Sequence, residues 1–316
     1  MRTTQILVAD LGGTHARFLL TGDTRRFTPD APLELPSADF SDMDSLVTQA
    51  LKRLRLGDGT GVRAMLAVAG PVREDRAKLT NLSWSIDAAA LKQRFGFASV
   101  GVLNDLAAAA WALSDGAPQD VKTLREGRNQ GRSLVISVST GVGTAYWSKS
   151  GHQVHVDAAE GGHAGFAAAD DWSLGFLKEL QRQHGTRISW ERVLSGSGLA
   201  ALDAHLRGGD ALAAAEVTRR AKAGEATALN SVARYARLLG AFAGDLVLAA
   251  PAPGGVWLMG GVLEGLGPVF DGAGFLRGFG DKGRLSPQLV GVPVHLTVDD
   301  GLGLRGAWVR ARQAED

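Results

Sequence analysis

The residues with the most chemical content lie in a Gly-rich turn near the start of the chain. The sequence Asp10-Leu11-Gly12-Gly13-Thr14 follows a short apolar run, and a second apolar run comes after it. Adjacent glycines let the chain turn tightly and let a ligand approach the backbone amides. Successive amides in such a turn form a concavity that suits phosphate. Asp10 could hold a hydrated Mg²⁺ and Thr14 could hydrogen-bond a phosphate oxygen, although a plain β-hairpin turn is the alternative.

Two further Gly clusters follow the same pattern. Thr140-Gly141-Val142-Gly143 separates two apolar runs, and Gly260-Gly261 ends a third run. The Walker loop is excluded because no Lys lies near either of the first two turns. The dinucleotide fingerprint is excluded at the first two turns because it should open a helix, whereas a strand follows each of these two turns. Three such loops in one chain favour nucleotide binding over ordinary turns.

A carboxylate and an amide stand at the end of another apolar strand, in Leu103-Asn104-Asp105. Asp105 is either the N-cap of the helix that follows or a functional carboxylate. The second reading has support because open α/β sheets bind ligands at the carboxyl ends of their strands. Asn104 beside it can bind a hydroxyl group.

More polar groups gather in Glu160-Gly161-Gly162-His163, with Glu191 and Asn81 elsewhere in the chain. Carboxylates, amides and an imidazole can together satisfy the many hydroxyls of a sugar. The set His152, His155, Glu160 and His163 could also be read as metal ligands. We favour this less because the spacing does not fit a helix, and the Gly pair suggests close approach of a ligand.

The elements that must position these groups alternate between strand and helix, which predicts an α/β fold. Helices are predicted over 41–54, with Ser41 as N-cap, and over 87–95, 105–113, 172–184, 225–250 and 302–311. Strands are predicted over 6–10, 16–21, 62–69, 99–103, 134–139, 144–149, 255–259 and 292–298. The strand–turn–strand design of residues 6–21 recurs at 134–149, which indicates an internal duplication. No Pro-rich or charged linker separates the halves.

Composition excludes several classes of protein. The 316 residues include 42 Gly, but without a collagen-like period. With 34 basic and 33 acidic residues, the charge suggests no nucleic-acid or membrane partner. The absence of Cys excludes disulfides, thiolate catalysis and Cys-ligated metals. No apolar stretch is long enough for a signal peptide or a membrane span, so we expect a cytoplasmic protein.

The order of these motifs resembles the bacterial ATP-dependent glucokinase family, within the superfamily of hexokinase, actin and heat-shock chaperones. The motifs are ADLGGTHAR, LTNLSW, LNDLAA, STGVGT, EGGHAGF, ERVLSGSG, GGVWLMGG and DDGLGLRGAW, and they run almost end to end. Relatives in the repressor–kinase group carry a Cys-rich zinc motif after the histidine. This chain has no Cys, which places it in the zinc-free branch.

The resemblance implies a two-domain, duplicated actin-like (ribonuclease H-like) α/β fold with an interdomain cleft. The domains would be residues 1–109 plus 303–316, and 110–302. It implies ATP and Mg²⁺ as cofactors. The nucleotide contacts it implies are Ala9, Asp10, Leu11, Gly12, Gly13, Thr14, Thr140, Gly141, Gly260 and Gly261. Asp10 would hold the metal through water.

The resemblance also implies the chemistry of the sugar site. Asp105 would be the catalytic base that activates the 6-hydroxyl of glucose, and the protein would be a homodimer. The implied sugar contacts are Asn81, Asn104, Asp105, Glu160, His163 and Glu191. Ser139 departs from the family, which usually has Gly there. A kinase of mannose or glucosamine is an alternative. A non-catalytic sugar-responsive regulator is less favoured because only a few residues precede Asp10.

Overall fold

The computed structural model of the chain describes residues 5–22, 27, 31–79, 84–128, 130–151, 153–185 and 187–313. They divide into two compact units. Unit 1 comprises Met1–Pro118 and Asp299–Asp316, and unit 2 comprises Gln119–Val298. The predicted boundary at residue 109 falls inside helix α3 (Asp105–Asp115), which continues until Gly116 ends it at a φ of 148°.

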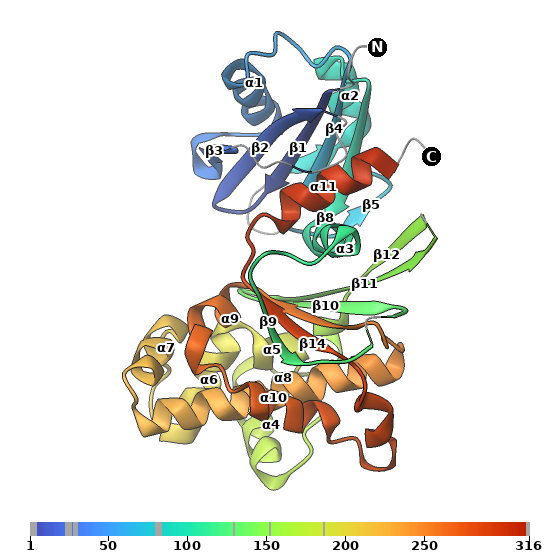
Figure 1. Cartoon of the computed structure of the whole chain (residues 1–316). Coiled ribbons are helices and arrows are strands. Elements are labelled where there is room, and N and C mark those ends of the chain that lie inside the picture. Colours follow the sequence, from blue (N-terminus) through green and yellow to red (C-terminus); the bar gives the residue numbers. More distant parts are fainter. Residues whose placement is uncertain are drawn as a thin grey trace. The chain divides into compact units, whose positions relative to one another are not determined.

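The main sheet of unit 1 has five strands in the order β3-β2-β1-β4-β8 (Figure 1). They are β1 (Gln5–Leu11), β2 (His15–Gly22), β3 (Leu33–Pro36), β4 (Val62–Val68) and β8 (Ser99–Asn104). Strand β1 pairs antiparallel with β2 and parallel with β4, and β4 pairs parallel with β8. The carboxyl ends of β1, β4 and β8 therefore lie along one edge of the sheet. Register places Asn104 opposite Val68, and Val68 opposite Leu11.

Alternation along β1 determines which face each side chain meets. Leu7, Ala9 and Leu11 join the core beneath helix α1 (Met43–Arg53) and helix α2 (Ala88–Phe95). Side chains two residues apart share a face of a strand. Asp10 therefore points to the opposite face, where α3 and α11 (Leu302–Gln313) pack. In Figure 1, α11 lies against this sheet although it is the last element of the chain.

Unit 1 also contains the 3-10 helix η1 (Ser37–Asp39) and a small three-stranded sheet. Its strands are β5 (Val72–Arg73), β6 (Arg76–Lys78) and β7 (Ser85–Asp87). Helices α3 and α11 approach closely, since a Cβ on Gly306 would lie 1.7 Å from the carbonyl oxygen of Ala108. Only glycine fits at this contact, so the two helices form a tight layer over β1 and β4.

The sheet of unit 2 has the order β12-β11-β10-β13-β14-β9. Its strands are β9 (Val121–Arg125), β10 (Ser133–Val138), β11 (Val142–Ser150), β12 (Gln153–Ala159), β13 (Gly255–Met259) and β14 (Val294–Thr297). From β12 to β14 the order and the strand directions repeat those from β3 to β8. The predicted duplication is therefore confirmed by topology, and β9 is an addition at the far edge.

Helices cover the sheet of unit 2 and enclose a large apolar core. They are α4 (Asp171–His184), α5 (Trp190–Leu194), α6 (Gly196–Arg207), α7 (Ala214–Lys222), α8 (Ala226–Ala249), α9 (Gly261–Leu266) and α10 (Gly272–Gly280), with the 3-10 helices η2 (Gly161–His163), η3 (Gly267–Val269) and η4 (Gly283–Leu289). Helix α8 packs closely on α10, because a Cβ on Gly240 would lie 2.0 Å from the carbonyl oxygen of Phe275.

The predicted helices and strands are all present, with ends that differ by a few residues. One cap prediction was wrong. Asp42, not Ser41, caps α1, because its side chain accepts from the Ser45 amide in a capping box. The Ser41 hydroxyl instead donates to the Asp42 carboxylate, so it supports the cap from outside the helix.

Candidate active site

The first Gly-rich turn joins β1 to β2 and is fastened from outside the hairpin. The Gly12 amide donates to the carbonyl of His15 at 3.0 Å, so it is used within the turn and is not free for a phosphate. Ser37 of η1, which is buried, donates through its hydroxyl to the Gly12 carbonyl at 3.0 Å and through its amide to the Thr14 carbonyl at 2.9 Å. Sequence reasoning missed Ser37, since no pattern links η1 to this turn.

Of the other residues predicted in this loop, two are strand residues. Ala9 and Leu11 are fully buried in the core and pair with both β2 and β4. They set the position of Asp10 and of the turn. Gly13 is half-buried and Thr14 is exposed, so both are accessible to a ligand.

Asp10 has an unusual electrostatic environment. The pKa of its carboxyl group is raised from 3.8 to about 6, first by burial and next by the nearby charge of Asp105. Arg17, its cross-strand neighbour, lowers the pKa, while Asp300 raises it. Arg17 also forms ion pairs with Asp300 at 3.3 Å and with Glu34 at 3.7 Å, so its positive charge is shared among several carboxylates rather than given to Asp10 alone. The site therefore holds two carboxylates whose charges a cation would offset.

Helix α11 leaves space for the Asp10 carboxylate. A Cβ on Gly303 would lie 2.7 Å from the carboxylate, a distance at which something must shift. Gly303 sits in the first turn of α11, where backbone N–H groups favour a negative charge. The closing motif of the chain thus positions the aspartate of the opening motif.

The structure shows which residue caps α3, a point on which the sequence left two interpretations of Asp105 open. Asn104 is the N-cap of α3, and its side-chain oxygen accepts from the amides of Leu106 and Ala107 at 2.9 and 3.2 Å. Its amide nitrogen donates to the Gly70 carbonyl at 3.1 Å, which leaves one N–H for a ligand. Asp105 is the first residue of the helix rather than its cap, so the cap interpretation of Asp105 was wrong.

The second Gly-rich turn, between β10 and β11, is held by backbone bonds and one carboxylate. The Ser139 amide donates to the Gly141 carbonyl at 2.9 Å, and the Ser139 carbonyl accepts from the Gly196 amide at the start of α6. Thr140 is exposed and Gly141 is half-buried. Glu191 accepts from the Val142 amide at 3.0 Å.

The third Gly cluster follows β13, which pairs with β10. Gly260 has a φ of 107°, and a Cβ there would lie 2.5 Å from the Val138 carbonyl oxygen. Gly261, in contrast, faces open space. Gly260 is therefore required by the neighbouring strand, whereas nothing in the described structure lies within 4 Å of a Cβ at Gly261.

Backbone pairing places His163 beside Glu191. The Ala164 carbonyl accepts from the Trp190 amide at 2.9 Å, and the Phe166 amide donates to the Ile188 carbonyl at 2.8 Å. These bonds bring the imidazole Nδ1 of His163 to 4.0 Å from a Glu191 carboxylate oxygen, while its Nε2 lies 3.8 Å from Glu160. The three predicted residues therefore form one cluster, in which Glu160 and His163 are largely exposed.

The Gly161-Gly162 pair has a packing role that the sequence did not reveal. A Cβ on Gly162 would lie 2.1 Å from the Val142 carbonyl oxygen, and one on Gly161 would lie 2.9 Å from the Thr144 hydroxyl. The Gly161 amide also donates to that hydroxyl at 3.0 Å. The pair thus lets η2 pack on the start of β11.

Some predictions fall outside the described residues. These are Asn81 and His152. His155 lies on β12 and is exposed. Among the residues that the structure describes, no group of three or more His, Cys, Asp or Glu could hold a metal ion, so the histidine metal site gains no support. No helix in this described part of the chain is long and apolar enough to span a membrane.

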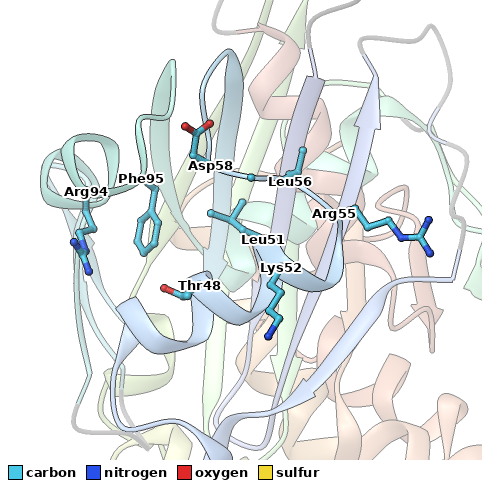
Figure 2. Close-up of a pocket in the computed structure, with 9 residues that line it drawn as sticks. Thr48, Leu51, Lys52, Arg55, Leu56, Asp58, Arg94 and Phe95 are labelled. Carbon is cyan, nitrogen blue, oxygen red and sulfur yellow. The ribbon is translucent and has the colours of Figure 1, made fainter.

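A hollow of about 590 Å³ lies on unit 1 between the ends of α1 and α2 (Figure 2). Its lining contains Lys52, Arg55 and Arg94 around an apolar floor that includes Leu51 and Phe95. None of the predicted site residues lines it. Lys52 and Arg94 lie in the last turns of α1 and α2, where they complement the helix dipoles, and Arg55 follows the end of α1. The hollow thus differs in place and chemistry from the Gly-rich turns.

Known proteins resemble this chain over nearly its whole length. A family model described as Glucokinase matches residues 7–314. A glucokinase of Caulobacter vibrioides is 34% identical, over 96% of this chain and 94% of that protein.

Among solved structures, the glucokinase from an Antarctic psychrotroph is similar with a TM-score of 0.86 and 32% identity, covering 99% of this chain and all of that one. A ROK family glucokinase from Streptomyces griseus, solved with glucose and AMPPNP, has a TM-score of 0.64. At 21% identity, over 98% of this chain and 99% of that one, it shows the common fold alone. The chain belongs to the glucokinase family, and its fold is the duplicated actin-like fold of those sugar kinases.

Proposed function

We propose that this protein transfers the γ-phosphoryl group of ATP to the 6-hydroxyl of glucose, giving glucose 6-phosphate and ADP. The observation that carries the proposal is the position of Asp105. It stands at the carboxyl edge of the sheet as the first residue of α3, where Asn104 provides the cap and the Asp105 carboxylate accepts from the Leu106 amide at 2.9 Å, and it is close enough to Asp10 that its charge raises the pKa of Asp10. A carboxylate of this kind can accept the proton of an attacking hydroxyl.

Phosphoryl transfer depends mainly on positioning and on neutralising charge. In this proposal the phosphates bind at the turns around Gly13 and Thr140, and Gly261 lies near the nucleoside. Asn104, Asp105, Glu160, His163 and Glu191 contact the sugar. Asp105 takes the proton of the 6-hydroxyl as that oxygen attacks the γ-phosphorus.

The donor set fits Mg²⁺, because carboxylate oxygens are the ligands it prefers and it commonly retains several waters. Asp10 would hold the ion through water. Burial raises the pKa of Asp10 because it disfavours the negative charge, and a bound cation would offset that cost. When bound, Mg²⁺ supplies neutralisation of the phosphate charge. Asp10 itself would bind and orient the hydrated ion. Its position on β1 is set by β2 and β4, the two strands that flank β1.

A coupled assay of ADP release over a panel of glucose, mannose and glucosamine tests the proposal. We expect the highest kcat/KM with glucose, and a fall in kcat of about 10²–10⁴-fold in Asp105→Asn with sugar binding largely kept. Preference for another hexose would change the substrate but keep the kinase. No turnover with any hexose, or unchanged kcat in the variant, would refute the proposal.

Two further expectations accompany this function. We propose a homodimer in the cytoplasm, as in the family that the sequence resembles. Sedimentation equilibrium should give twice the mass of one chain, and a monomeric mass at micromolar concentration would contradict the dimer.

A further inference from the structure

The Glu191 carboxylate lies between two loops to which the proposed function assigns different substrates. One of its oxygens, Oε2, accepts from the Val142 amide at 3.0 Å, at the end of the second phosphate loop. The other oxygen, Oε1, lies 4.0 Å from Nδ1 of His163 in the sugar cluster. A single, partly buried side chain thus lies beside both loops.

The phosphate loop is shaped around this carboxylate. A Cβ on Gly141 would lie 2.8 Å from Oε2, so the absence of a side chain at Gly141 leaves the space that the carboxylate occupies. The other bonds of the loop run from the Ser139 amide to the Gly141 carbonyl and from the Gly196 amide to the Ser139 carbonyl. The Val142 amide is held by the side chain of Glu191 instead.

The sugar cluster reaches the same residue by a second route. Gly162, which precedes His163, packs its Cα against the Val142 carbonyl oxygen, where a Cβ would lie 2.1 Å away. The amide of Val142 therefore meets Glu191, and its carbonyl meets the turn that carries His163. A displacement of Glu191 or of the turn that carries His163 would therefore also displace Val142.

Glu191 is itself held firmly. It is carried by α5, whose Trp190 packs edge-on against Phe166 with ring centroids 4.9 Å apart. The carbonyl of Leu194, at the end of α5, accepts from the buried Tyr235 hydroxyl at 2.6 Å. Because the helix is fixed, freedom remains mainly in the carboxylate itself.

We propose that Glu191 couples the binding of the two substrates within unit 2. A sugar that contacts Glu191 and His163 fixes the carboxylate on the Val142 amide, and this orders the loop that receives the ATP phosphate. The proposal rests on the proposed kinase function and adds a positioning role for Glu191. Coupling between two sites is reciprocal, so a bound nucleotide must tighten sugar binding by the same factor.

Calorimetric titration of a non-hydrolysable ATP analogue, with Mg²⁺ and with or without saturating glucose, tests the coupling. For the wild type we expect glucose to lower the dissociation constant of the analogue by at least about fivefold, within the range usual for coupled sites. Glu191→Asp keeps the charge but is one methylene shorter, so one carboxylate can no longer serve both loops. In that variant we expect glucose to change the analogue's dissociation constant by less than about twofold, the coupling being lost.

Glu160→Asp is the matched control. Glu160 belongs to the same sugar cluster, and its described contact is with His163 rather than with the phosphate loop. Both variants should weaken glucose binding, yet only Glu191→Asp should lose the coupling once glucose is raised to saturation. Wild-type coupling in Glu191→Asp, or equal loss in both variants, would overturn the proposal.

Hydrogen exchange gives a measurement that needs no variant. Glucose alone, without nucleotide, should slow exchange at the Val142 amide of the wild type, and an unchanged rate would count against the coupling. If the wild type bound neither glucose nor the analogue, the proposed function would fail. If it bound both independently, the function would stand and the coupling alone would be refuted.

Discussion

Replacing Asp10 with Asn should make the protein more stable at neutral pH while impairing its activity. The pKa of Asp10 rises from 3.8 to about 6 on folding. At neutral pH the folded protein must therefore either bind a proton at Asp10 or bury its negative charge, and both reduce the free energy of unfolding. Each pKa unit corresponds to about 1.36 kcal/mol, and the full difference therefore to about 3 kcal/mol. Asp10 retains some solvent contact, so we expect about 1–3 kcal/mol in practice. Asn has the shape of the protonated acid and avoids this cost.

The sign of the pH dependence follows from the direction of the change. A carboxyl group with a raised pKa in the folded state favours folding below its unfolded pKa, and this contribution is lost as pH rises through the folded pKa. The free energy of unfolding of Asp10→Asn should therefore match that of the wild type near pH 4. It should exceed the wild-type value by about 1–3 kcal/mol above pH 6.

Denaturant unfolding of both proteins at about pH 4, 6 and 8, without Mg²⁺ or nucleotide, measures this difference. Asp42→Asn is the control, because hydrogen bonds from Ser45 lower the pKa of Asp42 and reverse the expected trend with pH. Mg²⁺ with ATP should reduce the advantage of Asp10→Asn, since a cation offsets the buried charge. A variant no more stable than the wild type at pH 8, or a difference independent of pH, would refute the reasoning.

Three further substitutions test how the site is supported. Asn104→Ala removes the cap of α3 and should cost about 1 kcal/mol in thermal or chemical unfolding, with an unchanged midpoint as the contrary result. Ser37→Ala removes the bond to the Gly12 carbonyl and should raise the KM for ATP while leaving that for glucose unchanged; equal changes in both would contradict it. Gly303→Ala should destabilise unit 1 by about 1–3 kcal/mol through the Asp10 contact, although Ala is the better helix former. In an Asp10→Ala background the same change should stabilise, and a persistent loss there would refute the contact.

The sequence predicted just over half of the α-helices and strands that the structure describes, and it did so where their signals are local. Apolar runs such as 134–139 and the helical period over 41–54 depend on neighbours a few residues apart. The short strands β3 and β9 and the five-residue helix α5 carry no such signal. Helix α5 depends on partners distant in sequence, including the Tyr235 hydroxyl that binds the Leu194 carbonyl.

The candidate site was predictable as a set of residues but not as a set of contacts. Asp105, Glu160 and Glu191 could be named because their types and motifs point to chemistry. The support of Gly12 by Ser37, and the capping of α3 by Asn104 rather than Asp105, arise from three-dimensional packing. One available signal was overlooked. Gly303 and Gly306 lie three apart on one face of α11, a spacing that indicates close approach by another element.

The positions of the glycines give the clearest relation between packing and chemistry. In each unit, a glycine provides the space for one proposed functional carboxylate: Gly303 for Asp10 and Gly141 for Glu191. Gly162 and Gly306 instead admit backbone carbonyls, which cannot move aside. Alanine at the first pair displaces a side chain that has other rotamers, so the protein should still fold, at the cost of about 1–3 kcal/mol given above for Gly303, and with altered substrate binding. Alanine at the second pair displaces the main chain, so it should reduce stability before it affects substrate binding.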